Sequence, residues 1–275
     1  MRTPAATVDS TVWRRAGATD GKRLVPEEAA VAFSYDGGTY AVMMATPQNL
    51  DDFALGFSLT EGIVATPADI RQLDVVEFEA GIELRMWLAD PRATALIERR
   101  RHVAGPTGCG LCGIESLEEA VRALPRVDDQ TTFTPAQIMQ ALETLSPRQE
   151  LNRQTRAVHA AAFWRPDPGL VALREDIGRH NALDKLAGAL SHSAVSARGG
   201  MVLLTSRVSV EMVQKTAVIG APLIVAVSAP TALAIRTAEA AGITLAAIAR
   251  SDGFELFTHP HRIKESNAET VTNVA

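Results

Sequence analysis

Cys109 and Cys112 are the only cysteines of the chain, and they stand three residues apart within Gly108–Gly113. A thiol reacts as its thiolate, and nearby backbone N–H groups or cations lower its pKa. Four of the nine residues from 105 to 113 are glycine, so another molecule's sulfur can approach closely. The pattern favours thiol chemistry on a loop that swings between two partners.

Two other uses of the cysteine pair remain open. A structural zinc site needs two more ligands, and His102, His159 and His180 show no paired ligand spacing. A thioredoxin-like dithiol normally opens a helix directly, whereas Gly113 and the predicted helix cap at Ser116 intervene here. A zinc-stabilised nucleotide-binding module and a dithiol–disulfide oxidoreductase are therefore the alternatives to a thiol carrier.

Polar residues follow two predicted strands. The stretch from Arg174 to Asn181 ends one strand and enters a helix, whose N-terminal amides attract anions such as phosphate. The alternative, favoured by these residues alone, is a capping network of Asp and Asn with one satisfied histidine. Thr205-Ser206-Arg207 follows a buried strand, where Arg207 can hold phosphate or belong to an ordinary polar loop.

A third polar region lies near the C-terminus, at residues 250–254 and 257–260. An arginine and an aromatic ring near strand ends can pair with and stack on a guanine-like base. The alternative is a terminal strand whose phenylalanines pack into the core. Glu211 and Lys215 stand at i, i+4 and predict a solvated helix face. Ser228 is predicted to cap a helix that starts at Pro230.

Composition bounds the class of protein. The 275 residues are 47% hydrophobic and 21% charged, which is typical of a globular chain with a proper core. A net charge of −5 without a basic block, and only 5% aromatic residues, disfavour nucleic acid as a partner. The sequence contains no uninterrupted apolar run of about 18 residues, so it predicts no membrane-spanning helix. The N-terminus lacks the apolar segment of a secretory signal peptide. We therefore expect a cytoplasmic protein.

The first half of the chain predicts a small α+β domain over residues 29–104. Two hairpins are expected there, the first turning at Asp36-Gly37-Gly38 and the second at Ala80-Gly81. Thr46-Pro47 predicts the start of a helix between them. Residues 1–28 are expected to form a flexible, weakly ordered arm or an edge strand, and residues 105–124 a cysteine-containing glycine-rich loop with a short helix.

Residues 125–263 alternate between strand and helix patterns. Continuous apolar strands separated by helices predict a sheet covered on both faces, a three-layer α-β-α domain with a mixed sheet in an α/β (α+β) chain. Ligands in such sheets bind at the carboxyl ends of the strands, where the polar stretches above lie. Residues 264–275 predict a polar, frayed tail. The strands are expected at 158–164, 170–174, 201–205, 223–227 and 243–249, and the helices at 181–190, 210–219 and 230–241.

Three motifs in this order resemble the FdhD/NarQ family of formate dehydrogenase accessory sulfurtransferases, which are sulfur carrier proteins. The resemblance extends over residues 25–263. It implies a cytidine-deaminase-like fold for the larger domain, but no histidine here begins the H-x-E of working deaminases. The motifs are Gly108–Gly113, Arg174–Lys185, and Thr205-Ser206-Arg207 with Glu211–Lys215, followed by Ala229-Pro230-Thr231 and Phe257-Thr258-His259-Pro260.

The resemblance implies a function. Such proteins accept sulfur from a cysteine desulfurase as a cysteine persulfide and pass it to Mo-bis(molybdopterin guanine dinucleotide), or its tungsten counterpart, as a bound substrate. Formate dehydrogenase then receives this cofactor. The resemblance favours Cys109 as the persulfide site and suggests a homodimer. Residue chemistry alone does not separate the two cysteines: Cys112 is within reach to assist release by forming a disulfide or to serve as an alternative carrier. We expect no resident metal. A guanine nucleotide is expected to mimic part of the cofactor. The cofactor-binding residues implied are Arg250, Asp252, Gly253, Phe254, Glu255, Leu256, Phe257, Thr258 and His259, with Arg207, Arg179 and His180.

Overall fold

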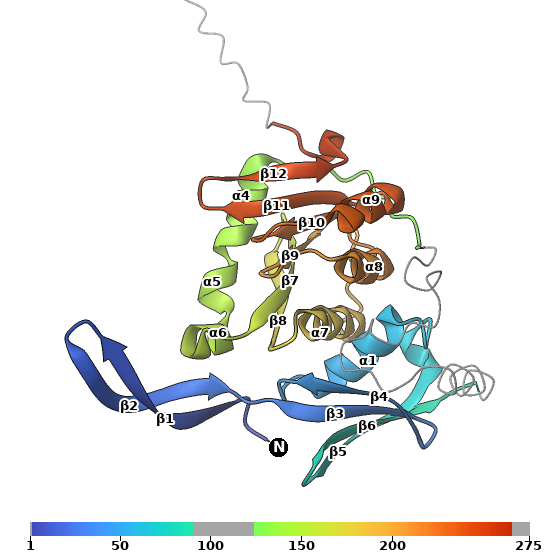
Figure 1. Ribbon diagram of the computed structural model, residues 1–275. Helices are drawn as coiled ribbons and strands as arrows, with labels where there is room; N and C mark the ends of the chain where they lie inside the picture. The colour runs from blue at the N-terminus through green and yellow to red at the C-terminus, as the bar shows by residue number, and fades with distance from the viewer. Residues whose placement is uncertain (1, 91–123, 266–275) are drawn as a thin grey trace, which may run out of the picture.

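The computed structural model describes residues 2–90 and 124–265, whose strands form three sheets (Figure 1). Cys109, Cys112 and the short helix predicted after Ser116 lie outside the described residues. Within the described part, no helix is long and apolar enough to cross a membrane.

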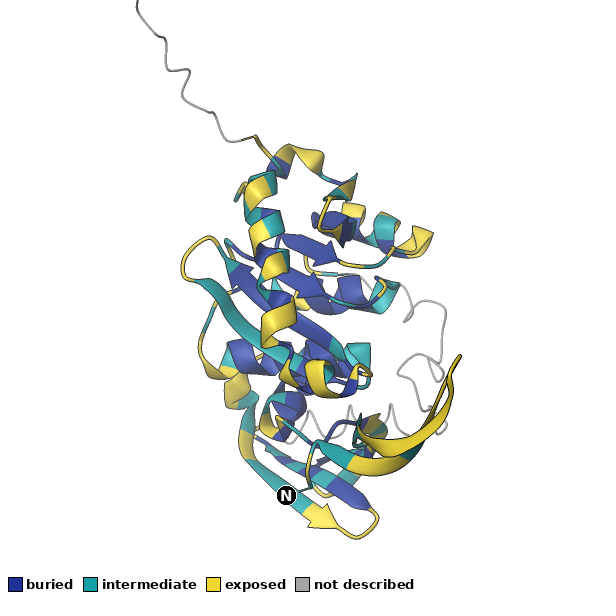
Figure 2. Ribbon diagram, turned by 90° about the vertical axis from the view of Figure 1, so that its left-hand side faces the viewer, coloured by how far each residue is buried: buried dark blue, intermediate teal, exposed yellow. Residues whose placement is uncertain are grey.

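The N-terminal residues form a regular hairpin. Strands β1 (Ala5–Arg14) and β2 (Gly17–Pro26) pair antiparallel over their whole length, and Gly17, at φ 121°, follows the turn between them. The sequence predicted a weakly ordered arm or a first edge strand here; the residues do form strands, but within the described residues the two strands pair with each other and not with the edge of another sheet. Threonine and valine, which favour strands, are common in β1. In the described structure this hairpin joins neither of the other sheets, and most of it is exposed (Figure 2).

The small α+β layer contains both predicted hairpins, now within one sheet of order β4-β3-β6-β5. Helix α1 (Leu50–Thr60) covers one face, where the ring of Phe33 meets Phe53 edge-on at 4.9 Å and stacks on Phe57 at 4.1 Å. The remaining elements are β3 (Ala29–Tyr35), β4 (Gly38–Ala45), η1 (Pro67–Asp69), β5 (Ile70–Phe78) and β6 (Gly81–Leu88).

Helix α1 begins later than predicted. Thr46-Pro47 was expected to open it, but the helix starts at Leu50 after Asn49, which has φ 54°. The Thr46 hydroxyl instead accepts a hydrogen bond from the backbone N–H of Ile177, 131 residues away. A tertiary contact therefore takes the side chain that local pattern assigned to a cap.

The larger sheet has the order β12-β11-β10-β9-β7-β8. Strands β9, β10 and β11 are parallel to one another. Strand β7 is antiparallel to both of its neighbours, β9 and β8, so β8 runs in the same direction as β9, β10 and β11. Edge strand β12 is antiparallel to β11. The strands are β7 (His159–Arg165), β8 (Gly169–Asp176), β9 (Met201–Leu204), β10 (Leu223–Ala226), β11 (Thr244–Arg250) and β12 (Gly253–Thr258).

Helices cover both faces of this sheet, as the predicted three-layer arrangement requires (Figure 1). Alternate residues of β9 point to opposite cores: Val202 and Leu204 pack with α7 to α9, Met201 and Leu203 with α4 and α5. The helices are α4 (Pro135–Glu143), α5 (Leu145–Arg148), α6 (Glu150–Thr155), α7 (Arg179–His192), α8 (Val210–Ile219) and α9 (Ala232–Ala241), followed after β12 by η2 (Pro260–Arg262).

Helix α9 is capped by Thr231 and not by Ser228. The Thr231 hydroxyl accepts from the N–H of Ala234 at 3.2 Å, and the helix starts at Ala232. Pro230 lies outside the helix because it forms a parallel bridge with Val208 in the loop after β9. Pairing between two strand-end loops therefore delays the helix.

Two glycines bring α1 and α7 into backbone contact. A Cβ added to Gly56 would stand 1.7 Å from the carbonyl oxygen of Asp184, and one added to Gly188 would stand 1.9 Å from that of Asp52. No other residue fits either position without moving a helix. This contact joins the small layer to the larger sheet (Figure 1).

Candidate functional site

Half of the twelve predicted ligand-binding residues lie at one edge of the larger sheet, where the parallel strands end: Arg179, His180, Arg207, Arg250, Asp252 and Gly253. Strands β8, β9, β10 and β11 run in the same direction, and their carboxyl ends form this edge, which we call the carboxyl edge. The turn at Arg179-His180, the loop at Arg207 and the turn at residues 250–253 follow these strands and therefore lie there. Arg207, Arg250 and Asp252 are exposed. These segments therefore follow strands that end on the same side of the sheet, which is where ligands of such sheets bind.

The predicted C-terminal loop, in contrast, is split between opposite edges. Residues from Gly253 to Thr258 form strand β12, which runs back beside β11 and spans roughly 17 Å at the usual rise per residue. Thr258 is buried, accepts from the N–H of Leu245 and donates to the carbonyl of Ile243, at the start of β11. Thr258 and His259 are therefore far from Arg250, and the ten residues do not form one loop.

The aromatic residues of this segment pack into the protein. Phe254 packs against the core beneath α4, and Phe257 against the core beneath α7 to α9. Glu255 and Leu256 are exposed between them. A terminal strand with packed phenylalanines was the alternative prediction, and the structure has this arrangement.

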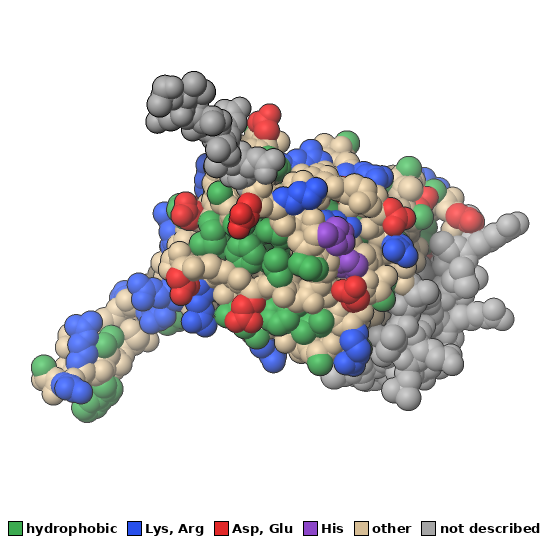
Figure 3. All heavy atoms as spheres, turned by 90° about the horizontal axis from the view of Figure 1, so that it is seen from above, with side chains coloured by type: hydrophobic (Ala, Val, Ile, Leu, Met, Phe, Trp, Pro, Cys, Tyr) green, Lys and Arg blue, Asp and Glu red, His purple; other side chains and the backbone are tan. Residues whose placement is uncertain are grey.

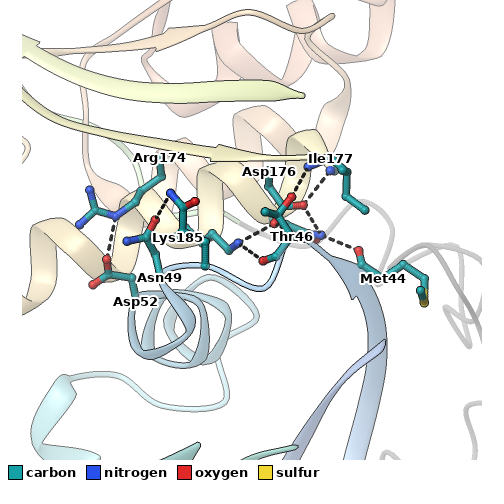
Figure 4. A network of polar contacts seen from close by, with 11 residues as sticks. Met44, Thr46, Asn49, Asp52, Arg174, Asp176, Ile177 and Lys185 are labelled. Atoms are coloured by element: carbon teal, nitrogen blue, oxygen red, sulfur yellow. Dashed lines mark hydrogen bonds and ion pairs between the residues drawn. The ribbon is translucent and has the colours of Figure 1, made fainter. Parts of the chain in front are cut away.

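Asp176 is the centre of a buried polar network at the end of β8 (Figure 4). Its carboxylate accepts from the backbone N–H of Thr46 at 3.0 Å and of Gly178 at 2.7 Å. It also accepts from Asn181 Nδ2 at 2.9 Å and from Lys185 Nζ at 2.6 Å. The capping network that these residues alone favoured is thus present, and it ties the start of α7 to the small layer.

Lys185 extends this network and was missed as a candidate, because it lies among the apolar residues of α7. Its side chain is fully buried, and Nζ also donates to the carbonyl of Thr46 at 2.8 Å. Burial lowers the pKa of Lys185, and the Asp176 carboxylate opposes that shift. Nearby, Arg174 pairs with Asp52 of α1 at 2.7 Å (Figure 4). In the motif Arg174–Lys185, the residues Arg174, Asp176 and Lys185 therefore serve to hold the fold together.

Lys215 is a second buried cation, not part of a solvated face as predicted. Its Nζ lies 2.6 Å from Glu61 Oε1, 2.9 Å from Asp184 Oδ1 and 3.0 Å from Thr60 Oγ1. Burial alone would lower the pKa of Lys215, but the carboxylates of Asp184 and Glu61 raise it well above its ordinary value. The i, i+4 spacing with Glu211 could not reveal these partners, since they come from α1 and α7.

Four polar side chains at the starts of α7 and α8 form what we call the carboxyl-edge cluster: Arg179, His180, Ser209 and Glu211. His180 Nε2 lies 3.9 Å from Glu211 Oε2. In the described structure neither atom has a hydrogen-bond partner, and the same is true of Arg179 Nε and Ser209 Oγ, although all four atoms are buried. Buried polar atoms usually have partners, so this cluster is the strongest candidate for contact with something else.

The charge state of the cluster follows from its surroundings. Burial, reinforced by the positive charge of Arg179, lowers the pKa of His180 to about 4. Burial and Arg179 also lower the pKa of His159, which pairs across the strands with Asp176 at the same edge. Both imidazoles are therefore neutral near pH 7, and Arg179 is the cation of the cluster.

A cavity of about 490 Å³ lies at the other ends of these helices. It is lined largely by apolar side chains, and none of the predicted site residues that the structure describes belongs to it. Among residues 2–90 and 124–265, no three His, Cys, Asp or Glu side chains gather as ligands for a metal ion. The apolar side chains that line the cavity include Leu59, Val64, Leu190, Val195 and Ile219.

Comparison with known proteins matches the chain to the FdhD/NarQ family model over residues 26–264. A protein of Agrobacterium fabrum named sulfur carrier protein FdhD is 54% identical over 257 residues, 93% of this chain and 95% of the relative. One of Brucella abortus with the same name is 55% identical over 254 residues, 92% and 94% of the two chains.

A crystal structure from Desulfotalea psychrophila, provisionally assigned as a formate dehydrogenase accessory protein, has the same fold. It superposes with a TM-score of 0.75 at 24% identity, covering 94% of this chain and 99% of that one.

Proposed function

The chain belongs to the FdhD/NarQ family, and from this membership we propose that it is a sulfur carrier that serves formate dehydrogenase. The observation that carries the proposal is the identity of more than half of the residues, over nine-tenths of the chain, with relatives named as sulfur carriers. The paired thiols of Cys109 and Cys112 supply the chemistry that such a carrier needs.

We propose that Cys109 is the carrier residue. Its thiolate attacks the terminal sulfur of a persulfide on a cysteine desulfurase, forming Cys109–S–SH and releasing the donor cysteine as a thiolate, without net oxidation. Cys112 can then attack the inner sulfur, releasing hydrogen sulfide and leaving a disulfide that a dithiol reductant reopens. The flanking glycines support this role, because they leave room for a second sulfur.

The sulfur acceptor in this proposal is the molybdenum of Mo-bis(molybdopterin guanine dinucleotide), bound as a substrate. Three arginines at the carboxyl edge, Arg179, Arg207 and Arg250, support binding of its phosphates, since guanidinium groups pair well with phosphate oxygens. The net charge of −5 makes such a local site necessary. We place Asp252, Gly253 and Phe254 beside it and leave Thr258 and His259 outside, because they lie at the opposite edge.

Persulfide analysis tests the carrier residue. After treatment with a cysteine desulfurase and cysteine, we expect cyanolysable sulfur and a mass increment of one sulfur atom on the wild-type chain. Cys112→Ala should keep the modification and Cys109→Ala should lose it. An equal persulfide yield on Cys109→Ala would remove the assignment, and a yield that needs both cysteines would favour a dithiol oxidoreductase.

Nucleotide binding tests the cofactor site separately. We expect guanosine diphosphate to slow hydrogen exchange at residues 250–254 and to leave the far end of β12 unchanged. Arg207→Ala should weaken binding, whereas Arg148→Ala, on α5 of the other face, should not. Unchanged exchange at millimolar nucleotide would count against this site. Cytoplasmic location and delivery to formate dehydrogenase itself also belong to the proposal.

A further inference from the structure

The N-terminal hairpin, residues 5–26, projects from the body of the protein, and we call it the arm (Figures 1 and 3). Near its root, Arg23 donates a hydrogen bond to the carbonyl of Thr155 at 3.2 Å, which ties the arm to the body. Strands of ten residues are about 33 Å long at the usual rise per residue. The far end of the arm, residues 12–19, is therefore held away from the body, and we call it the tip.

The tip combines apolar area with positive charge. Trp13 is 79% exposed and Val12 is 44% exposed. Arg14 and Arg15 follow directly, and residues 12–19 contain no acidic residue. Most tryptophan side chains are largely buried in folded proteins, so an exposed indole beside two arginines indicates a contact with something outside this chain.

The charges of the arm are also separated between its two faces. Residues that are partners in the strand register share a face, so Val12, Arg14 and Arg23 lie on one face. Asp9 and Asp20, the acidic residues of the arm, both lie on the other face. In Figure 3 the arm shows Lys, Arg and hydrophobic side chains side by side. One face of the arm is therefore apolar and cationic without a neutralising carboxylate of its own.

The charge of the arm differs in sign from that of the body. The arm contains four basic and two acidic residues, a net +2, whereas the whole chain carries −5, so the rest of the chain carries −7. An anionic surface repels this remainder, but charges are screened over about 8 Å at physiological ionic strength. The arm is several times longer than this distance. Its tip can therefore meet an anionic surface while most of the body stays outside the range of repulsion.

An anionic phospholipid surface matches the chemistry of the tip. Tryptophan is enriched at the level of the lipid headgroups, and arginine pairs with phosphate oxygens. A shaped protein partner, in contrast, is recognised through several directed hydrogen bonds. Apart from Trp13 and the two arginines, the only polar side chain of the tip is the hydroxyl of Thr19. The tip therefore fits a uniform charged surface better than a specific protein site.

We propose that the arm attaches this protein reversibly to an anionic phospholipid surface, with Trp13 at the level of the headgroups and Arg14 and Arg15 against the phosphates. Apolar contact and basic charge act together in such attachment, which needs no helix that crosses the bilayer. The family model starts at residue 26, so the arm lies outside the matched part. The proposal does not depend on sulfur transfer, so it can fail while the carrier function stands.

Co-sedimentation of the full-length chain with vesicles tests the proposal. We expect binding to vesicles of phosphatidylglycerol and phosphatidylcholine in equal parts, and little to phosphatidylcholine alone. Arg14→Gln/Arg15→Gln should weaken binding about 25-fold, because each basic residue near the surface contributes about fivefold. Arg71→Gln/Arg236→Gln, which removes two exposed arginines of the body, is the matched control and should bind like the wild type. A wild type that ignores the anionic vesicles, or an arm variant that binds as well as the control, would overturn the proposal.

A second measurement guards against an arm variant that merely loses its hairpin. Quenching by brominated lipids reports the position of Trp13 in the unaltered arm, with Trp13→Phe as the reference for the other two tryptophans. We expect anionic vesicles to quench the wild type more than Trp13→Phe, and added salt to remove the difference. Equal quenching of the two proteins would mean that the arm lies against a protein surface, of a second copy or of another chain, and the proposal would be wrong.

Discussion

Replacing Lys185 by methionine removes the cation from a carboxylate that has no access to water. Both side chains are fully buried, with Nζ 2.6 Å from Asp176 Oδ2. Breaking a buried ion pair costs about 3–5 kcal/mol, because the remaining charge is left without its partner. Asp176 keeps three N–H donors, from Thr46, Gly178 and Asn181, so we expect a loss near the lower limit, about 3 kcal/mol.

The measurement is urea denaturation followed by circular dichroism and by the fluorescence of the buried Trp164. The double variant Asp176→Asn/Lys185→Met should lose at least about 1 kcal/mol less than the sum of the two single variants, since it leaves no unpaired charge. Lys22→Met, on the exposed arm, is the control and should change stability by less than about 0.5 kcal/mol. Equal costs for Lys185→Met and Lys22→Met, or strictly additive costs, would refute this reasoning.

Three further changes test other parts of the structure by denaturation. Gly188→Ala places a Cβ 1.9 Å from a carbonyl oxygen of α1 and should cost about 3 kcal/mol or more; Gly21→Ala, with no atom within 4 Å, should cost less than about 0.5 kcal/mol, and equal costs would contradict the contact. The pKa of His180 is about 4 in the folded chain and 6.5 when unfolded, so the unfolded state binds more protons between these values. The free energy of unfolding should therefore decrease as the pH is lowered from 6.5 to 4, and it should decrease less steeply in His180→Asn. A His180 imidazole that titrates near pH 6.5 by NMR would contradict this prediction. Thr231→Ala should cost about 1 kcal/mol and Ser228→Ala almost nothing, and similar losses would mean that the cap is misassigned.

Local pattern was sufficient for most elements of the fold. The turn at Asp36-Gly37 placed the first hairpin, and the apolar periodicity of α8 predicted its observed bounds, Val210–Ile219. The start of α1 was not predictable, because Thr46 bonds to a residue 131 positions away. The arm was also missed as a paired structure, since its exposed strands carry no alternation of buried and polar residues.

The position of the candidate residues in the sheet was predictable where it depends on sheet geometry. The strand-end rule placed Arg179, Arg207 and Arg250 at a common edge, and the topology agrees. Thr258 and His259, which the family resemblance implied, lie at the opposite edge, because residues 253–258 pair as a strand that leads away. Residue spacing also cannot separate a surface pair from a buried network, as Lys215 shows, since the partners belong to other helices.

The crossing of α1 and α7 limits how the protein can move. At Gly56 and Gly188 each helix fills the space that a side chain of the other would occupy. Sliding by one residue would drive a Cβ into a backbone carbonyl, so the two layers cannot shear past each other in the way that packed helices with flexible side chains do. Any rearrangement of the protein must therefore leave this joint intact and take place elsewhere in the chain.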